Sequence, residues 1–440
     1  MANKIVNATQ LDQDLTSVAN AIRRSSGINK ELSFPDDFIS EIDDLERADL
    51  TIPKDVDFID FDGRLLYSYT AAEFMELNGL PPNPSYPGLV AQGWNWTLED
   101  AQEFVGQYGA LVVGQNYTTD TGRTRIYITI SDARLGINFV IFLNLTSGSS
   151  CTIDWGDGNI TTMTATGNKT HTYTQAGNYI IQIAVSSGSV RLGYWGANNT
   201  LVGTNQNNKL AVNKVEIGDN VIGLCRNAFY EFPNLKSVSI PTTCIQHDTG
   251  SDYAIFGGQL LTGIVFPNGT NGQDTIIMGR ENQSALIHLK YVSIPKTMNG
   301  FRITSTYPRL LRKLIFPSYT SSATLQLYLY DVTSLTHFIV PGTYTTIPTD
   351  RCRSSLIKKL TIPSTVTSIA ATAFRYNNFL EEIHLLPTTP PTLANVNAFS
   401  DASSNCIFYV PYSADHSILA AYQAATNWST YASKMQEEPQ

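Results

Sequence analysis

Leu235-Lys-Ser-Val238-Ser-Ile240-Pro241 is one copy of a seven-residue phrase that recurs through the second half of this 440-residue chain. Five similar copies and then two looser ones end at later prolines: Pro267, Pro295, Pro317, Pro341, Pro363, Pro387 and Pro411. By subtraction, successive prolines lie 26, 28, 22, 24, 22, 24 and 24 residues apart. A period of this length predicts a solenoid, in which each repeat packs on its neighbours.

Each phrase predicts one short strand. Val238 and Ile240 lie two positions apart and face the core, whereas Ser239 between them faces outward. Proline then ends the strand because it cannot donate a ladder hydrogen bond. Ala-Phe pairs at 228–229 and 373–374, six residues before the next leucine, are expected to fill the core opposite the strand. Stacked repeats should align one apolar column: Ile240, Phe266, Ile294, Phe316, Val340 and Ile362.

This pattern resembles the BspA-type leucine-rich repeats, whose usual wording is an Ala-Phe pair, a variable step and then Leu-x-x-Ile-x-Ile-Pro. The resemblance runs from about Val212 to Pro411 and is carried mainly by the periodicity, since the middle repeats lack a visible Ala-Phe pair. It implies a leucine-rich-repeat solenoid over residues 211–440. A helix over Ser417 to Tyr431 should cap the last repeat, and the tail from Gln436 is expected to be disordered.

Composition and charge limit the function classes. The net charge is −9, and residues 1–150 carry 10 basic and 21 acidic side chains, so no basic face rich enough to bind nucleic acid is expected. No Cys-x-x-Cys pair suggests a zinc site, and the five cysteines are expected to be buried free thiols. The first residues lack the apolar core of a secretory signal, and no run is long enough to span a membrane. No cofactor is expected.

Two segments precede the repeats at the N-terminus. Residues 1–48 predict two short amphipathic helices, which would pack on the next domain, dock on a partner or self-associate through their apolar stripes: Leu15, Val18, Ile22, Phe38 and Ile42. Residues 49–118 predict a small α/β module, with a strand near Val56. Capping boxes at Thr70 and Thr97 begin helices that end at Gly79 and near Tyr108.

Residues 119–190 contain Asp154-Trp-Gly-Asp-Gly158 and a later His171-Thr-Tyr173 with Gly177-Asn-Tyr179. These motifs resemble the PKD domain, an immunoglobulin-like β-sandwich, which implies that Trp155 is buried and that 157–158 form a tight turn. Asp154 and Asp157 would shape this turn, although two such acids could also bind calcium or act in glycoside hydrolysis. Residues 191–210 are rich in Gly, Asn and Thr and predict a linker.

The N-terminal wording, including Asp60-Phe-Asp-Gly63 and Gln92-Gly-Trp-Asn-Trp96, resembles a segment of predicted phage structural proteins of anaerobic gut bacteria. In that family the segment precedes a PKD-like domain and leucine-rich repeats. The resemblance implies a virion protein, assembled in the host cytoplasm with other phage structural proteins. It also implies a homo-oligomer, with a trimer as the guess.

The predicted fold is therefore mostly β and multidomain, and the predicted function is non-enzymatic. No Gly-x-Ser-x-Gly, His-Glu-x-x-His or phosphate-binding loop is present. The first hypothesis is a phage tail fibre or receptor-binding component that touches a bacterial surface glycan or protein. The alternatives are a bacterial surface adhesin, a head decoration fibre and a virion enzyme that degrades polysaccharide.

Contact with the receptor is expected at outward strand positions and tyrosines of the repeats, although Tyr328 and Tyr330 could instead fill the core. Lys313 and Lys359 belong to basic pairs that could meet an anionic wall polymer, with avidity in an oligomer adding strength. The candidate contacts are Tyr291, Tyr319, Tyr328, Tyr330, His337, Tyr344, His384, Lys313 and Lys359.

Overall fold

The chain divides into two compact units, Met1–Ile52 and Pro53–Gln440. In this computed structural model the described residues all belong to the second unit. They are 53–194, 200–225, 227–247, 254–257, 260–270, 277–278, 288–298, 310–315, 335–340, 342, 344–349 and 357–439. The predicted N-terminal helices and their attachment residues lie outside them. Within the described residues, no helix is long and apolar enough to cross a membrane.

The predicted α/β module forms a four-stranded sheet with two helices. In the order β2-β1-β4-β3, its strands are Leu65–Tyr69, Val56–Ile59, Leu111–Thr119 and Leu89–Trp94, and its helices are α3 (Ala71–Met75) and α4 (Leu98–Tyr108). The capping box of α3 is present, because the Thr70 and Glu73 side chains each accept from the other's backbone N–H. Helix α3 ends before the predicted stop at Gly79, whereas α4 ends at Gly109, which is left-handed with φ of 77°. We call residues 53–119 the α/β cover.

The next segment is a two-sheet β-sandwich. One sheet contains β5, β10, β7 and β8 and the other contains β11, β6 and β9. Trp155 and Tyr173 are fully buried between the sheets, as expected for Trp155. The Asp154 and Asp157 carboxylates accept from the backbone N–H groups of Gly156 and Asn159, so both acids shape the turn. The strands are Thr124–Ile130 (β5), Asn138–Leu145 (β6), Ser150–Asp154 (β7), Ile160–Met163 (β8), Gly167–Thr172 (β9), Gly177–Ser187 (β10) and Val190–Leu192 (β11), with a 3-10 turn at Asp132–Arg134.

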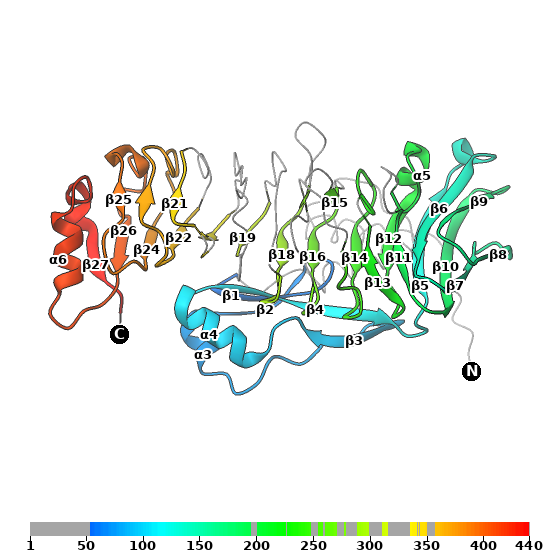
Figure 1. Ribbon diagram of the computed structural model, residues 1–440, viewed down its shortest axis with the longest axis horizontal. Helices are drawn as coiled ribbons and strands as arrows, with labels where there is room; N and C mark the ends of the chain where they lie inside the picture. The colour runs from blue at the N-terminus through cyan, green and yellow to red at the C-terminus, as the bar shows by residue number, and fades with distance from the viewer. Residues whose placement is uncertain are drawn as a thin grey trace, which may run out of the picture. The chain divides into compact units, whose positions relative to one another are not determined.

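The repeats form the predicted solenoid (Figure 1). Each phrase supplies one strand of a parallel layer, and five predicted column residues, Ile240, Phe266, Ile294, Val340 and Ile362, are buried in one core. Phe316 lies outside the described residues. The strands of this layer are β12 (Val212–Glu216), β14 (Ser237–Ser239), β16 (Gly263–Val265), β18 (Tyr291–Ser293), β19 (Lys313–Leu314), β20 (His337–Ile339), β22 (Lys359–Ile362), β24 (Glu382–Leu385), β26 (Ile407–Val410) and β27 (Met435–Glu437).

Short strands and aromatic stacks lie opposite the phrase layer. The expected Ala-Phe step is buried there, and the rings of Phe374 and Phe399 stack with centroids 5.3 Å apart. Buried rings repeated at one period hold successive turns in register. The opposite strands are β13 (Val221–Leu224), β15 (Ala254–Phe256), β17 (Ile277–Met278), β21 (Thr346–Ile347), β23 (Ser368–Ile369) and β25 (Thr392–Leu393), with a 3-10 turn at Val396–Ala398.

The segment between sandwich and solenoid differs from the predicted linker. Strand β12 pairs antiparallel with β5 of the sandwich, and β11 pairs parallel with β13 of the solenoid. Helix α5 (Gln206–Ala211) leads directly into β12, and Leu201 and Val202 are fully buried. A linker was expected here, but Leu201 and Val202 belong to the core at the junction. Sandwich and solenoid therefore share both sheets.

The C-terminal end is capped as predicted, with one correction. Helix α6 (Ser417–Ala424) and the 3-10 helix Trp428–Lys434 bury Tyr422 and Trp428, which hydrogen-bond the carbonyl oxygens of Pro387 and Pro391 at 2.9 and 2.7 Å. The tail was expected to be disordered from Gln436. Instead, β27 pairs parallel with β26, because the exposed edge of the last repeat offers unpaired backbone groups.

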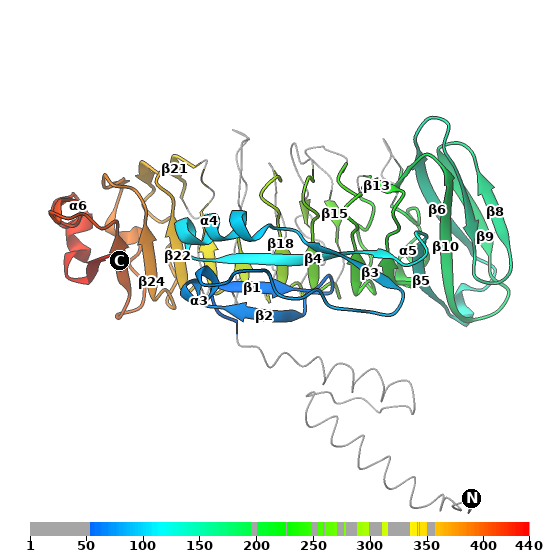
Figure 2. The ribbon, with the colours of Figure 1, turned by 90° about the horizontal axis from the view of Figure 1, so that it is seen from below.

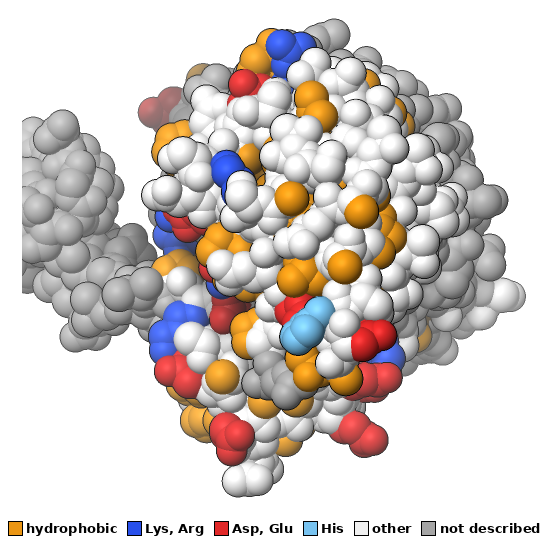
Figure 3. All heavy atoms as spheres, turned by 90° about the vertical axis from the view of Figure 1, so that its left-hand side faces the viewer, with side chains coloured by type: hydrophobic (Ala, Val, Ile, Leu, Met, Phe, Trp, Pro, Cys, Tyr) orange, Lys and Arg blue, Asp and Glu red, His pale blue; other side chains and the backbone are white. Residues whose placement is uncertain are grey.

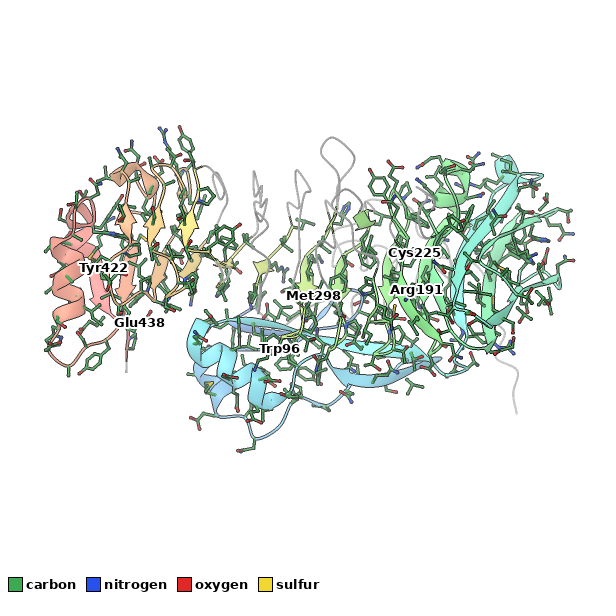
Figure 4. The ribbon with its side chains drawn as sticks, in the orientation of Figure 1. Trp96, Arg191, Cys225, Met298, Tyr422 and Glu438 are labelled. Atoms are coloured by element: carbon green, nitrogen blue, oxygen red, sulfur yellow. The ribbon has the colours of Figure 1, made fainter. Side chains whose placement is uncertain are left out.

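The α/β cover lies against the outward face of the phrase layer, and β4 runs across the solenoid strands (Figure 2). Asn95 donates to the Phe266 carbonyl oxygen at 2.8 Å, and the Trp96 indole donates to that of Ile294 at 3.0 Å (Figure 4). Gly114 of β4 is needed here, since a Cβ would overlap the side chains of Val265 and Ser293. Asn95 and Trp96 of the Trp-Asn-Trp motif thus join the cover to the repeats.

A buried ion pair completes this contact. The Lys313 ammonium lies 2.6 Å from an Asp57 carboxylate oxygen, and both side chains are fully buried. Lys313 also donates to the Asp55 carbonyl oxygen at 3.0 Å, and the Ser68 hydroxyl donates to Asp57 at 2.6 Å. Burial lowers the pKa of Lys313, although Asp57 opposes that shift. Each charge is therefore compensated by a group from the other part of the fold.

We predict that Ile294→Asp destabilises the protein by several kcal/mol, because it places an unpaired charge in the core column. Chemical denaturation would measure the free energy of unfolding. Ile160→Asp is the matched control, since Ile160 is 66% exposed. An unchanged unfolding midpoint for Ile294→Asp would contradict the stacking register.

We predict that Lys313→Met costs about 3–5 kcal/mol, because it leaves the Asp57 carboxylate buried and uncompensated. The double variant Asp57→Asn/Lys313→Met should recover much of that loss, since no buried charge remains. Lys358→Met, at a neighbouring exposed lysine, should change stability by less than about 0.5 kcal/mol. Additive effects of the two substitutions in denaturation experiments would show that the pair does not couple cover and solenoid.

Candidate functional site

The outward face of the repeats is not the open surface that the sequence predicted. Residues on outward strand positions form a second hydrophobic core with the α/β cover: Val265, Tyr291, Ile315 and Ile339. The prediction that Tyr291 contacts a receptor from an exposed position is wrong, because its side chain is fully buried. Strand alternation correctly placed Tyr291 outside the repeat core, but no sequence pattern indicates that the cover packs on it.

Lys313 is likewise unavailable as a surface cation. Its ammonium is sealed against Asp57, and the neighbouring Arg312 lies over the Tyr291 ring, 5.7 Å from its centroid. Lys358 faces Glu381 at 3.4 Å. The basic pairs therefore do not form the free positive surface that was expected to meet an anionic polymer.

Next to the core shared with the cover, which extends to Ile339 of β20, the outward face opens into a pocket of about 620 Å³. One wall comes from α3 and the end of α4, through Ala71, Ala72, Met75 and Val105. The other wall comes from β20, β22, β24 and the C-terminal tail. It carries most of the charged residues of the site, His337, Lys359, Glu382, His384 and Glu438, together with Thr361, while Asp55 reaches the pocket from the cover. Three predicted contact residues, His337, Lys359 and His384, are thus brought together.

Repeat periodicity sets the positions of these side chains. His337, Lys359 and Glu382 are register partners on β20, β22 and β24, so they form one row across the sheet. Thr361 and His384 lie in the next outward row, which continues to Tyr409 on β26. The His384 and Tyr409 rings stack with centroids 4.9 Å apart. Parallel, in-register pairing places equivalent side chains about 4.8 Å apart, so these residues must share one surface.

The polar side chains form a chain of ion pairs and hydrogen bonds, which we call the charge network. Asp55 Oδ1 lies 3.3 Å from both His337 Nε2 and Lys359 Nζ. Lys359 Nζ also lies 3.2 Å from Glu382 Oε2, which in turn lies 3.3 Å from His384 Nε2. His384 Nδ1 lies 2.7 Å from Glu438 Oε1. The network therefore links the cover, three repeats and the C-terminal tail, where Glu438 lies (Figure 4).

These contacts shift the ionisation of the network. Burial alone would raise the pKa of Asp55, but the hydrogen bonds from His337 and the Ala71 backbone, with the Lys359 charge, hold it well below its usual range. Burial would lower the pKa of His384, but Glu382 and Glu438 raise it to about 9. Burial lowers the pKa of His337. At neutral pH His384 is therefore a cation and His337 is neutral.

The remaining candidates fall elsewhere. Tyr344 is partly buried against the repeat core, and Tyr319, Tyr328 and Tyr330 lie outside the described residues. Sequence reasoning missed Asp55, Glu382 and Glu438. Glu382 occupies the same place in its phrase as Lys359 and His337, so the repeat register could have found it. Asp55 and Glu438 come from non-repeat segments and carry no such signal.

The pocket offers hydrogen bonds and charge for binding. Its described lining includes no serine or cysteine that could act as a nucleophile. Across the described part of the chain, no group of three or more His, Cys, Asp or Glu side chains is arranged to hold a metal ion. At the adjoining C-terminal end, acidic, basic and histidine side chains mingle on the surface (Figure 3). The arrangement suits recognition of a ligand with several polar groups.

Comparison with known families identifies the repeats. Residues 200–273 and 252–381 match the model of the BspA type leucine rich repeat region, in six copies. The matched residues fall within the solenoid and its junction with the sandwich, so BspA-type leucine-rich repeats are present. No curated protein matches the chain.

We predict that Asp55→Asn lowers stability at pH 7 by about 2 kcal/mol, because it removes the carboxylate that holds His337 and Lys359. The pKa of Asp55 is lower in the folded state than in the unfolded state. This stabilisation is therefore complete above the unfolded-state pKa of about 4 and is lost as the pH falls below it. Urea denaturation should therefore show a smaller difference from wild type at pH 3. The exposed Asp120→Asn is the control, and an equal loss at both pH values would contradict the ionic origin.

Proposed function

We propose that the chain is a non-enzymatic binding protein of a phage particle, a tail fibre or receptor-binding component that engages the bacterial surface through its repeats. One observation carries this proposal. The α/β cover buries outward positions of the repeats from β16 to β20, and a pocket opens between the cover and β20, β22 and β24. A pocket bounded by the cover on one side and the repeats on the other suits specific binding.

The other parts support this assignment as an attachment device. Residues 1–48 would fix the chain to other phage structural proteins, and oligomerisation, with a trimer as the working hypothesis, would multiply weak contacts. The sandwich, whose motifs resemble the PKD domain, would hold the repeats away from the particle. Because it shares both sheets with the solenoid, it would do so as a rigid extension.

A bacterial surface adhesin is the second candidate. The match to BspA-type repeats favours it, since that match concerns the binding part of the chain and carries no sign of a phage role. Immunogold electron microscopy of phage particles and of bacteria, with antibody to this chain, would separate the two. Gold on the tail would support the proposal. Gold on the capsid would favour a decoration fibre, and gold on uninfected cells an adhesin.

We predict that Ala72→Trp reduces binding of the full chain to bacterial cells at least tenfold. Ala72 is an exposed residue of α3 that lines the pocket, so a tryptophan there would fill it. Glu76→Trp, just beyond the end of α3 and outside the pocket lining, is the matched control and should bind like wild type. Flow cytometry with labelled protein across a panel of anaerobic gut bacteria would measure the effect.

The full chain is required for this experiment. A fragment beginning near residue 205 would lose β5, the partner of β12, and the cover over Tyr291 and Ile315. Such a fragment would expose apolar surface and bind non-specifically. Equal binding by wild type and Ala72→Trp would show that the cells are recognised elsewhere.

A further inference from the structure

The hydrogen-bonding groups of the pocket are unevenly used. Both ring nitrogens of His337 are engaged, by Asp55 and the Thr336 hydroxyl. Both ring nitrogens of His384 are engaged by Glu382 and Glu438. Lys359 uses two of its three N–H groups on Asp55 and Glu382. The donors on this wall are therefore nearly all occupied.

The acceptors are not fully used. Glu382 bonds through Oε2 and Glu438 through Oε1, and among the described residues neither second carboxylate oxygen has a hydrogen-bond partner. Both side chains are partly exposed, at 32% and 27%. A carboxylate can accept about four hydrogen bonds, so the open capacity of the pocket is that of an acceptor.

The net charge of the pocket lining also favours a ligand that donates hydrogen bonds. Asp55, Glu382 and Glu438 contribute three negative charges, whereas Lys359 and the doubly paired His384 contribute two positive ones. Lys313, behind this wall, is neutralised by Asp57. The lining therefore carries a net charge of about −1 at neutral pH. Such a pocket repels phosphate and carboxylate ligands and attracts cations.

We propose that this pocket binds the ammonium group of a primary amine carried on a compact, otherwise uncharged body. The ammonium would donate to the free oxygens of Glu382 and Glu438, and the body would lie against Ala71, Ala72, Met75 and Val105 on the opposite wall. A pocket of about 620 Å³ admits a ligand of one or two sugar rings or a short peptide. The amine would come from an amino sugar of a surface polysaccharide or from a lysyl group of a surface peptide. This inference rests on the proposed function for its biological source but not for its chemistry.

Calorimetric titration of the full chain at pH 7 and low salt would test it. Glucosamine and Nα-acetyl-lysine amide represent the two sources, and N-acetylglucosamine and the ε-acetylated lysine compound remove the charge from each. Both amines should bind at least tenfold more tightly than their acetylated partners, and added salt should weaken them. Tighter binding of glucosamine would assign the ligand to a polysaccharide, and tighter binding of the lysine compound would assign it to a peptide.

Substitutions of the two glutamates would show which side chains bind the ammonium group. Glu382→Gln and Glu438→Gln keep the side-chain shape and should each weaken amine binding about tenfold, which corresponds to about 1.4 kcal/mol. Glu381→Gln is the matched control, because Glu381 pairs with Lys358 and does not line the pocket. Melting curves would show that Glu438→Gln, in the C-terminal tail, remains folded.

The proposal is overturned if neither amine binds at millimolar concentration, if acetylated compounds bind as well as the amines, or if both glutamate variants bind like wild type. The experiments distinguish a failure of this ligand proposal from a failure of the proposed function. Cells bound in an Ala72-dependent manner without amine affinity would refute the ligand chemistry alone. Amine affinity in a chain that binds no cells would refute the surface-binding role alone.

Discussion

The buried ion pair between Asp57 and Lys313 is the contact on which the arrangement of cover and solenoid depends. Two charges can be buried away from solvent only when each compensates the other and further hydrogen bonds satisfy their remaining donors and acceptors. Here Ser68 and the Asp55 carbonyl oxygen supply those bonds. The pair adds little net stability compared with apolar residues of the same size. Its effect is specificity, since a placement of the cover that separated Asp57 from Lys313 would leave each charge without its partner.

The same cover explains the location of the pocket. Apolar outward residues from Val265 to Ile339 need burial, and the cover supplies it with the hydrophobic faces of β1 and β4. Further along the sheet the outward positions become His337, Lys359, Glu382 and His384, which need solvent or ionic partners. The core shared with the cover ends where the outward positions of the repeats change from mainly apolar to mainly charged, and the pocket lies at that boundary.

The sheets of the solenoid continue into neighbouring segments, which cover its exposed edge strands. A parallel stack has an unpaired strand at each end, which invites association with other chains. At the N-terminal end, β12 and β13 continue into the sandwich through β5 and β11. At the other end, β27 pairs with β26 under α6, and Glu437 and Glu438 place charge beside that last strand. The sandwich is therefore also the N-terminal cap of the repeats.

The sequence by itself determined the repeat register, the core column, the Ala-Phe stacks, the sandwich turn around Trp155 and the terminal cap. These features depend on local periodicity and turn chemistry, which neighbouring residues specify. It also indicated three residues of the candidate site, because outward positions can be read from strand alternation. Only the tertiary structure decided that Tyr291 and Lys313 are buried, that residues 200–211 are a junction, and that Asp55 and Glu438 complete the charge network. Those outcomes depend on contacts between segments up to about 300 residues apart, such as Asp55 with Lys359. No pattern in one segment specifies which distant surface will cover it.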